Sequence, residues 1–364
     1  PQSVLIRSTI GWFEPRFRSA EVFLEELLGS VSPITWSRTV NDAHVDLTDP
    51  ENVFKAKADY GRGWRNLSHH LTFFFFVIRR LSAIQPKIIY ACDLDTLLPS
   101  LIWRRNRSCL IIYDQFDPLS ARTQNKILRF LVNEFEYIVS RSSDVQITAN
   151  RLRIPKKLRA SWFEIKNLFP LNSPATSSKS DEPLILFYGG ILSFDRGLLA
   201  CVEAISMEEE WEFHLYGQGE LSETLTSKNF SNVFVHPPVP HDELMTLASK
   251  SHLFLAMYDP LLAHNKNTAS NKLFEAAQLG LPILTNNGTN IGYLTVQASL
   301  GWSVTYNDTR EIIRVLKEFA QTTQGKRETL KNNLLAFYTT QKIENDAERD
   351  RIKFRVKELL GGSV

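Results

Sequence analysis

Short apolar runs alternate with amphipathic segments along most of this sequence, and this alternation restricts the fold more than any other feature. VLIRS (4–8), KIIYA (87–91) and LIIY (110–113) are apolar almost throughout, which is typical of strands buried on both faces of a parallel sheet. Segments 20–28 and 127–139 carry apolar residues every three or four positions, which predicts helices. Strand followed by helix, repeated, predicts an α/β doubly wound sheet. Two further short strands are expected at 34–36 and 145–148.

The same alternation begins again after residues 171–182. That stretch, LNSPATSSKSDE, is rich in serine, proline and charge and has no periodicity, so we interpret it as a linker. Beyond it, strands are predicted at 184–188, 212–216, 232–235, 253–256 and 282–285, and helices at 197–205, 241–249 and 271–279. Since 364 residues suffice for two domains, we expect a first domain over 1–170 and a second over 183–340. A charged C-terminal helix over 341–364 is expected to pack back across their junction.

Composition excludes several classes of protein. Hydrophobic residues make up 43% of the chain and charged residues 23%, values that fit neither a disordered nor a fibrous protein. The three cysteines, Cys92, Cys109 and Cys201, lie far apart without CxxC spacing, which argues against a disulfide scaffold and a zinc ribbon. The longest apolar run, FFFFVI at 73–78, is far shorter than the ~20 residues that span a bilayer, and the sequence starts without a secretory pattern. We therefore expect a cytoplasmic protein, soluble or peripheral at a membrane.

Charge is distributed unevenly between the two halves. Residues 1–180 contain 25 Lys and Arg against 17 Asp and Glu, a net charge of +8, and since the whole chain has +2 the remainder has −6. The basic residues of the first half are interleaved with Trp64 and Trp103. We interpret these basic residues as a surface that attracts an anionic membrane or a lipid-diphosphate acceptor. The alternative is that they are ordinary solvent-exposed charges. Dispersed charge without a stacking module argues against nucleic acid as a partner. The phenylalanines at 73–76 point around a whole helix and are interpreted as helix core.

Three turns that follow predicted strands contain residues suited to bind phosphate. In YGGILSFDRG, Gly190 allows close approach of the backbone, and Arg196 precedes the unpaired N–H groups of a helix start, which favours a diphosphate ligand. In YGQGEL, Gly217 and Gly219 form a tight turn without the third glycine of a dinucleotide fingerprint. In SNKLFEAAQLG, Lys272 lies in the first helical turn, where the helix dipole disfavours a cation, and this position suggests an anionic ligand.

Three acidic residues complete the candidates. Glu275 lies one turn after Lys272 on the same helix face and can accept hydrogen bonds from the hydroxyls of a sugar. Taken singly, such a Lys and Glu could equally be solvent-facing side chains. Asp93 and Asp95 form a DxD string, which we interpret as the cap of a helix over 96–104 and not as a manganese site.

Taken together, these segments resemble the family-4 glycosyltransferases of the GT-B fold over nearly the whole chain. The matching segments are YGG…DRG (188–197), YGQGEL (216–221), 236–257 and 270–285 in the second half, and 14–23, 87–101 and 111–118 in the first. The resemblance implies two Rossmann-like doubly wound domains that face a cleft, the first binding the acceptor and the second the donor. It also implies transfer of a sugar from a nucleoside-diphosphate sugar to a glycan or lipid-linked acceptor, with retention of anomeric configuration and without a metal or another cofactor. The expected pathway is cell-surface polysaccharide biosynthesis.

The same resemblance implies roles for single residues. Arg196 and Lys272 would bind the donor diphosphate and stabilise the charge that develops on it as the sugar leaves. Glu275 would hold the ribose, and Gly11, after the first strand, would lie near the donor phosphates. Asp93 is the candidate carboxylate nucleophile if the reaction proceeds by double displacement. The other expected donor-binding positions are Gly190, Gly217, Gly219 and Asn267.

Three positions depart from the family pattern and leave alternatives open. Asn267 stands where a glutamate normally touches the donor sugar, Ile191 stands at the usual arginine, and the amino-domain histidine falls near Tyr90 or Cys92. These differences suggest an unusual donor geometry, or a protein that binds nucleotide sugar or glycan without turnover. A sugar-nucleotide epimerase or a glycoside phosphorylase of the same fold is the enzyme alternative.

Overall fold

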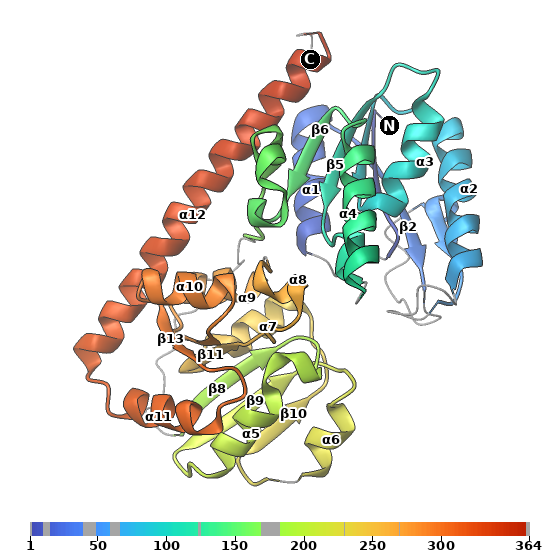
Figure 1. The fold of residues 1–364 in the computed structure, drawn as a ribbon. Coiled ribbons are helices and arrows are strands. Elements are labelled where there is room, and N and C mark those ends of the chain that lie inside the picture. The colour runs from blue at the N-terminus through green and yellow to red at the C-terminus, as the bar shows by residue number, and fades with distance from the viewer. Residues whose placement is uncertain are drawn as a thin grey trace. The chain divides into compact units, whose positions relative to one another are not determined.

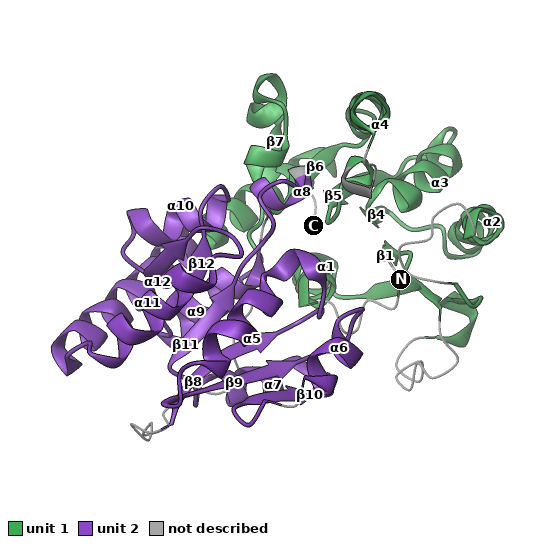
Figure 2. Cartoon of the chain, turned by 60° about the horizontal axis from the view of Figure 1, so that its bottom comes forward, with its two compact units in different colours: residues 1–166, 345–364 green, residues 167–344 purple. Residues whose placement is uncertain are grey.

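The structure, a computed structural model, describes residues 2–9, 15–38, 49–58, 66–122, 125–168, 183–228, 230–268 and 270–361 (Figure 1). The chain forms two compact units, and Figure 2 shows them in different colours. Unit 1 contains residues 1–166 and 345–364, and unit 2 contains residues 167–344. The predicted linker, 171–182, and Gly11 both lie outside the described residues.

Unit 1 contains a seven-stranded parallel sheet in the order β3-β2-β1-β4-β5-β6-β7. The strands are β1 (Ser3–Arg7), β2 (Val31–Ser37), β3 (Val53–Lys55), β4 (Ile88–Cys92), β5 (Leu110–Gln115), β6 (Val145–Thr148) and β7 (Trp162–Glu164). The helices are α1 (Pro15–Leu28), α2 (Leu67–Ile84), α3 (Leu94–Arg104) and α4 (Lys126–Ser140), together with the end of α12 (Gln324–Leu359). The chain moves outward from β1 to β3 and returns on the other side of β1 with β4. In a doubly wound sheet, ligands bind at the carboxyl ends of the strands at such a reversal.

The sheet of unit 1 lies between two hydrophobic cores, because successive residues of a strand point to opposite faces. On one face Val4 belongs to a cluster with Phe73 of α2 and Tyr137 of α4, and residues of α3 join the same cluster. On the other face Leu5 belongs to a cluster with Phe17 of α1 and residues of α12. Helices α2, α3 and α4 therefore cover one face of the sheet, and α1 and α12 cover the other.

Unit 2 contains a six-stranded parallel sheet in the order β10-β9-β8-β11-β12-β13. The strands are β8 (Leu184–Gly189), β9 (Trp211–Tyr216), β10 (Val233–His236), β11 (Leu253–Ala256), β12 (Ile283–Asn286) and β13 (Gly301–Val304). The helices are α5 (Leu198–Ser206), α6 (Ser222–Ser227), α7 (His241–Ala248), α8 (Ala263–Lys266), α9 (Asn271–Leu279), α10 (Asn290–Gln297) and α11 (Thr309–Ala320), followed by the first part of α12. Here the strand order reverses between β8 and β11, so the expected ligand position is at their carboxyl ends.

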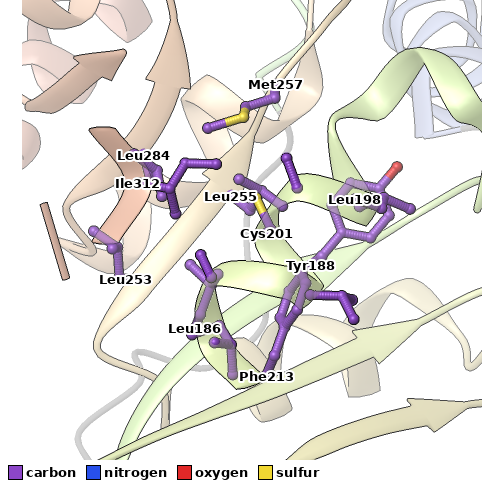
Figure 3. Close-up of a cluster of buried hydrophobic side chains, with 14 of the residues drawn as sticks. Leu186, Tyr188, Leu198, Cys201, Phe213, Leu253, Leu255, Met257, Leu284 and Ile312 are labelled. Atoms are coloured by element: carbon purple, nitrogen blue, oxygen red, sulfur yellow. The ribbon is translucent and has the colours of Figure 1, made fainter. Parts of the chain in front are cut away.

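The core of unit 2 also has two parts, one on each face of the sheet. Figure 3 shows part of the first, in which Leu186 of β8, Phe213 of β9 and Leu255 of β11 pack with Cys201 of α5. Burial raises the pKa of the Cys201 thiol, so this cysteine serves as a small apolar core residue. The two parallel sheets confirm the α/β doubly wound architecture predicted from the alternation.

Several helix boundaries differ from the predicted ones. Helix α1 begins at Pro15 and not at residue 20, α3 begins at Leu94 and not at 96, and α12 begins at Gln324 instead of 341. Helix α11 lies outside the predicted helices, although Ile312, Val315, Leu316 and Phe319 recur at helical spacing and are buried, so the sequence did contain its signal. Within the described part of the chain, no helix is long and apolar enough to cross a bilayer.

Candidate functional site

Two glycine turns lie in direct contact at the carboxyl edge of the unit 2 sheet. The Gly190 N–H, just after β8, donates to the Tyr216 carbonyl at the end of β9 (2.9 Å). Gly190 and Gly217 have φ angles of 144° and 152°, which residues with a Cβ atom rarely adopt. A Cβ on Gly217 would lie 1.8 Å from the Gly190 carbonyl oxygen, and one on Gly219 would lie 2.3 Å from the Leu192 carbonyl oxygen. The turns therefore require glycine, and they leave backbone exposed where a ligand can approach.

Lys272 reaches these turns from the first turn of α9. Ser270 is the N-cap of α9, and its Oγ accepts from the Lys272 N–H (3.2 Å). The Lys272 Nζ lies 2.8 Å from the position that a Cβ on Gly190 would occupy, and 5.0 Å from the centre of the Tyr188 ring. Burial lowers the pKa of Lys272, but the Tyr258 and Tyr188 oxygens and a nearby carboxylate outweigh it, so the pKa is raised above its usual value. Lys272 is therefore a cation at the end of β8.

Arg196, the second cation of the site, lies among Tyr258, Asn265 and Asp195. It closes a single 3-10 turn (Phe194–Arg196), and Gly197, with φ of 66°, leads from that turn into α5. The Arg196 guanidinium lies 4.5 Å from the centre of the Tyr258 ring, and its Nη1 lies 3.5 Å from Asn265 Oδ1 and 3.4 Å from Asp195 Oδ2. Asp195 accepts from Asn265 Nδ2 (3.1 Å). Burial would raise the pKa of Asp195, but its hydrogen bonds and Arg196 lower it, so Asp195 is ionised and fixes the position of Arg196.

Tyr258, which follows β11, connects the two cations. Its Oη is hydrogen-bonded to Ser270 Oγ (2.6 Å), the same atom that caps the helix carrying Lys272. Its ring faces Arg196. Arg196 and Lys272 are close enough for Arg196 to oppose the rise in the Lys272 pKa. Two neighbouring cations at a helix N-terminus and a pair of glycine turns form a site suited to a doubly charged anion.

Glu275 has a partner that the sequence reasoning did not identify. His241 Nε2, in the first turn of α7, donates to Glu275 Oε1 (3.1 Å). This hydrogen bond raises the pKa of His241, and burial opposes the rise. The Glu275 side chain is only 12% exposed. One of its two carboxylate oxygens therefore contacts His241, which leaves Oε2 for a ligand.

Two other predicted positions in unit 2 lie at the margin of this arrangement. Asn267 is at the C-terminal end of the short helix α8, and the asparagine that contacts Arg196 is Asn265, two residues earlier. Ile191 is exposed, and its carbonyl accepts from Tyr188 Oη (2.7 Å). The structure thus brings together Arg196, Lys272 and the three glycines, with Glu275 one helical turn beyond Lys272.

Asp93 lies in unit 1, at the carboxyl end of β4, and stands at the predicted N-cap position of α3. Its side chain makes no capping hydrogen bond to α3, and its φ of 68° is unusual for a residue with a Cβ. Instead, Oδ2 forms an ion pair with Arg7 of β1, and Oδ1 accepts from the N–H groups of Phe116 (2.8 Å) and Asp117 (2.9 Å). Burial raises the pKa of Asp93 to about 7 despite the opposing effect of Arg7. These contacts make Asp93 a residue that positions Arg7 and the turn after β5.

A second buried ion pair lies beside the first and was also missed from the sequence. Arg16 of α1 pairs with Asp114 of β5 (Nη2 to Oδ1, 2.6 Å), and Tyr90 Oη donates to Asp114 Oδ2 (2.7 Å). The guanidinium groups of Arg7 and Arg16 lie 4.5 and 5.1 Å from the centre of the Phe116 ring. The sequence did show a charged residue at or just after the end of each of these apolar strands: Arg7, Asp93 and Asp114. Such a residue by itself indicates only that a strand ends, and the strand order is needed to show that these ends are neighbours.

Comparisons with known proteins identify the fold and a class. Residues 197–349 match the model of a family described as glycosyl transferase-like. No curated protein matches the sequence significantly. Similar solved structures include sucrose-phosphate synthase from Thermosynechococcus elongatus, with a TM-score of 0.68 at 12% identity and all of both chains covered. WaaG, a glycosyltransferase involved in lipopolysaccharide biosynthesis, has a TM-score of 0.63 at 12% identity with 99% of each chain covered. HepE from Anabaena, in complex with UDP, has a TM-score of 0.66 at 15% identity with 96% of this chain and 98% of that chain covered.

The fold is GT-B. Structural similarity at such low sequence identity establishes the fold alone. The shared fold and the family match together support a glycosyltransferase. The family match begins one residue after Arg196 and includes Lys272 and Glu275.

Proposed function

We propose that the chain is a glycosyltransferase that binds a nucleoside-diphosphate sugar at the carboxyl edge of the unit 2 sheet. The observation that carries this proposal is the pair of cations, Arg196 and Lys272, held around Tyr258 beside the Gly190 and Gly217 turns. A diphosphate supplies two adjacent negative charges, and Arg196 can bind phosphate oxygens with two parallel hydrogen bonds. The acceptor in this proposal is a glycan or a lipid-linked glycan at the cytoplasmic side of a membrane, in cell-surface polysaccharide biosynthesis.

In the proposed reaction the bond between the anomeric carbon and the diphosphate breaks, and a bond to an acceptor hydroxyl oxygen forms. Negative charge develops on the departing diphosphate, where Arg196 and Lys272 stabilise it, and no metal ion is required. The proton of the acceptor hydroxyl passes to the diphosphate, and the anomeric configuration is retained. The contacts of Asp93 disfavour double displacement, because both of its carboxylate oxygens are already bound by Arg7 and by backbone N–H groups.

The ribose of the donor is proposed to bind to Glu275 through the carboxylate oxygen that His241 does not use. His241 then fixes the orientation of Glu275 through this hydrogen bond. Uracil is the first nucleotide base to test, since the structure of HepE, which shares the fold, contains UDP.

A thermal-shift screen of the full chain against nucleoside diphosphates tests the donor class. We expect UDP or another nucleoside diphosphate to raise the melting temperature and nucleosides without phosphate to leave it unchanged. Incubation with the matching radiolabelled nucleotide sugar and lipid-linked glycans then tests transfer, and NMR of the product determines the anomeric configuration.

A second candidate function is favoured by Asn267, which stands where the family has a glutamate that touches the donor sugar. It is binding of nucleotide sugar without turnover. Saturable binding with no product under any acceptor would favour it over transfer, and conversion of the free nucleotide sugar to its epimer would indicate an epimerase.

A further inference from the structure

Helix α4 of unit 1 turns its polar side toward the sheet. Glu136 is 1% exposed and accepts hydrogen bonds from Tyr113 Oη (2.7 Å), Gln115 Nε2 (2.6 Å) and the Leu119 N–H (3.0 Å). One residue later, Tyr137 Oη donates to the Arg153 carbonyl (2.8 Å). A buried carboxylate with three donors cannot leave its partners without a large cost in free energy. These contacts therefore fix the rotation of α4 about its axis.

The opposite side of α4 is apolar and faces outward. Ile127 is 73% exposed, and the other large apolar residues on this side are also exposed. They recur at the spacing of a helix face and include Leu128, Leu131, Phe135 and Ile138. A helix of a soluble protein normally buries such a stripe, and here the polar contacts of Glu136 prevent it. The exposed stripe on α4 therefore indicates a partner.

Helix α2 presents a second apolar stripe on the same layer of unit 1. Leu67, Leu71 and Phe75 are exposed at intervals of four residues, while Phe73 is buried beneath them. The expectation that the whole phenylalanine run forms helix core thus holds for Phe73 and fails for Phe75. Helix α3 lies between α2 and α4 and contacts both (Figure 1). Its Ile102 is exposed. We call these exposed residues the outer helix face: Leu67, Leu71, Phe75, Ile102, Ile127, Leu128, Leu131, Phe135 and Ile138.

The charges around the outer helix face are positive. Arg79 continues the stripe of α2, Arg105 and Arg107 follow α3, and Lys126 and Arg141 lie at the two ends of α4, all exposed. In the described residues 66–107 and 126–141, the acidic residues are buried (Asp93 and Glu136) or half-buried (Asp95 and Glu134), so the fully exposed charges there are all positive. Two copies of such a face would repel each other, whereas an anionic surface complements it.

A basic cavity adjoins the face at its edge. It has a volume of about 1150 Å³ and lies near the amino ends of β1, β4 and β5. Ile102 of the outer helix face lines it together with Lys87, Arg104, Arg105 and Arg107, and no acidic residue lines it. Arg104 is paired with Asp144 and Arg107 donates to the Trp103 carbonyl (2.6 Å), while Lys87 and Arg105 add two further positive charges to the lining. Such a cavity suits the phosphate of a headgroup at the border of the apolar stripe.

We propose that the outer helix face docks onto the surface of a bilayer that contains anionic phospholipid. Its apolar side chains enter the boundary between headgroups and acyl chains, and the surrounding arginines and Lys126 contact headgroup phosphates. The docking itself is independent of the proposed function. Only the further step, in which the docked enzyme meets a lipid-linked acceptor, rests on it.

Vesicle sedimentation of the full chain tests the docking. We expect binding to vesicles of phosphatidylcholine with phosphatidylglycerol, little binding to phosphatidylcholine alone, and weaker binding at rising salt. The double variant Ile127→Ser/Leu131→Ser should bind at least about tenfold more weakly, because it removes two apolar side chains from the contact. The variant Arg105→Glu should lower affinity by about fivefold or more, since one basic residue near the surface contributes about that factor.

The matched control is Ile343→Ser/Phe354→Ser on α12. These two residues are 66% and 73% exposed but lie outside the outer helix face, so vesicle binding should not change. Equal vesicle binding by the α4 double variant and the parent chain would overturn the proposal. The proposal would also be overturned if the parent chain did not bind vesicles and light scattering showed it to be a dimer that the α4 double variant converts to a monomer.

Nucleoside-diphosphate affinity, measured in the same samples, separates this proposal from the proposed function. The α4 variants lie in unit 1 and should keep the affinity of the parent chain. Vesicle binding without nucleotide binding would uphold the docking and count against the glycosyltransferase proposal, and the reverse result would do the opposite.

Discussion

At the scale of single residues, Tyr258 determines how the candidate site of unit 2 is assembled. Its Oη is bonded to Ser270, its ring faces Arg196, and its N–H donates to Asn286 Oδ1 at the end of β12 (2.8 Å). One aromatic residue after β11 therefore links an arginine before α5 with the N-terminus of α9. Removal of either cation should affect ligand binding more than folding, because the repulsion between the two cations offsets part of what each gains from its own protein contacts.

The variant Arg196→Ala should bind nucleoside diphosphate at least about tenfold more weakly and lose transfer activity, since a charge-assisted contact to phosphate is removed. Calorimetry measures the affinity, and the unliganded melting temperature reports the fold. Arg314→Ala, at a 60% exposed arginine of α11, is the control and should bind normally. Normal affinity of the Arg196 variant would exclude this residue from the site.

The variant Lys272→Met should lose stabilisation by nucleoside diphosphate while it lowers the melting temperature of the unliganded chain only slightly. Methionine fills a similar volume, and the lost attraction to the Tyr258 and Tyr188 oxygens and to Glu275 is partly offset because burial and Arg196 oppose the charge. Differential scanning fluorimetry with and without ligand measures both effects, with Lys250→Met at an exposed position as the control. A large drop in the unliganded melting temperature would show that Lys272 is structural.

The His241–Glu275 pair should make stability depend on pH. Glu275 raises the pKa of His241 above 6.5, so the protonated histidine is favoured in the folded state. Its contribution to the free energy of unfolding is complete below about pH 6.5 and is lost as the pH rises through the raised pKa. Urea unfolding across this range should show the loss, and Glu275→Gln should remove it. A pH dependence that survives in the glutamine variant would have to arise elsewhere.

At the scale of elements, the paired turns after β8 and β9 illustrate why glycine is needed at the edge of this sheet. The variant Gly217→Ala should lower the free energy of unfolding by about 3 kcal/mol or more, because its Cβ would overlap the Gly190 carbonyl and its φ is unfavourable. Gly325→Ala in α12, where a Cβ meets nothing within 4 Å, should instead be neutral or stabilise by up to about 1 kcal/mol. Urea unfolding of the two variants measures the difference, and equal effects would argue against the contact between the turns.

Helix α4 shows how far periodicity can predict an element. The repeat of apolar residues over 127–139 predicted the helix, and the structure has it over Lys126–Ser140. Periodicity identifies the apolar side of a helix but not the direction in which that side points. The direction was decided by Glu136 and its donors on β5 and before α4, residues that are distant in sequence or lie outside the repeat.

At the scale of the whole molecule, two units with their own cores share one long helix. Leu334 of α12 belongs to a core of unit 2, whereas Ile352 and Val356, farther along the same helix, are fully buried in a core of unit 1. Although residues 345–364 follow unit 2 in sequence, they therefore belong to unit 1.

The double variant Ile352→Ala/Val356→Ala should destabilise unit 1 by about 3 kcal/mol or more while it leaves unit 2 intact, because it creates a cavity only in the first core. Hydrogen exchange should rise in β1 and β4 and stay unchanged in β8 and β11. Phe354→Ala, at an exposed position between the two, should change stability by less than about 0.5 kcal/mol. Faster exchange in both units would mean that they unfold as one.

The sequence alone determined the alternation of strands and helices, the two parallel sheets, the glycine turns and the charges of Arg196 and Lys272, because these depend on neighbouring residues and on periodicity. Only the tertiary structure showed that Tyr258 and Ser270 join those two cations, that His241 binds Glu275, and that the side chain of Asp93, at the N-cap of α3, binds Arg7. Each of these contacts joins segments far apart in the chain. Which strand ends become neighbours depends on the order of strands in the sheet, and local sequence patterns do not contain that order.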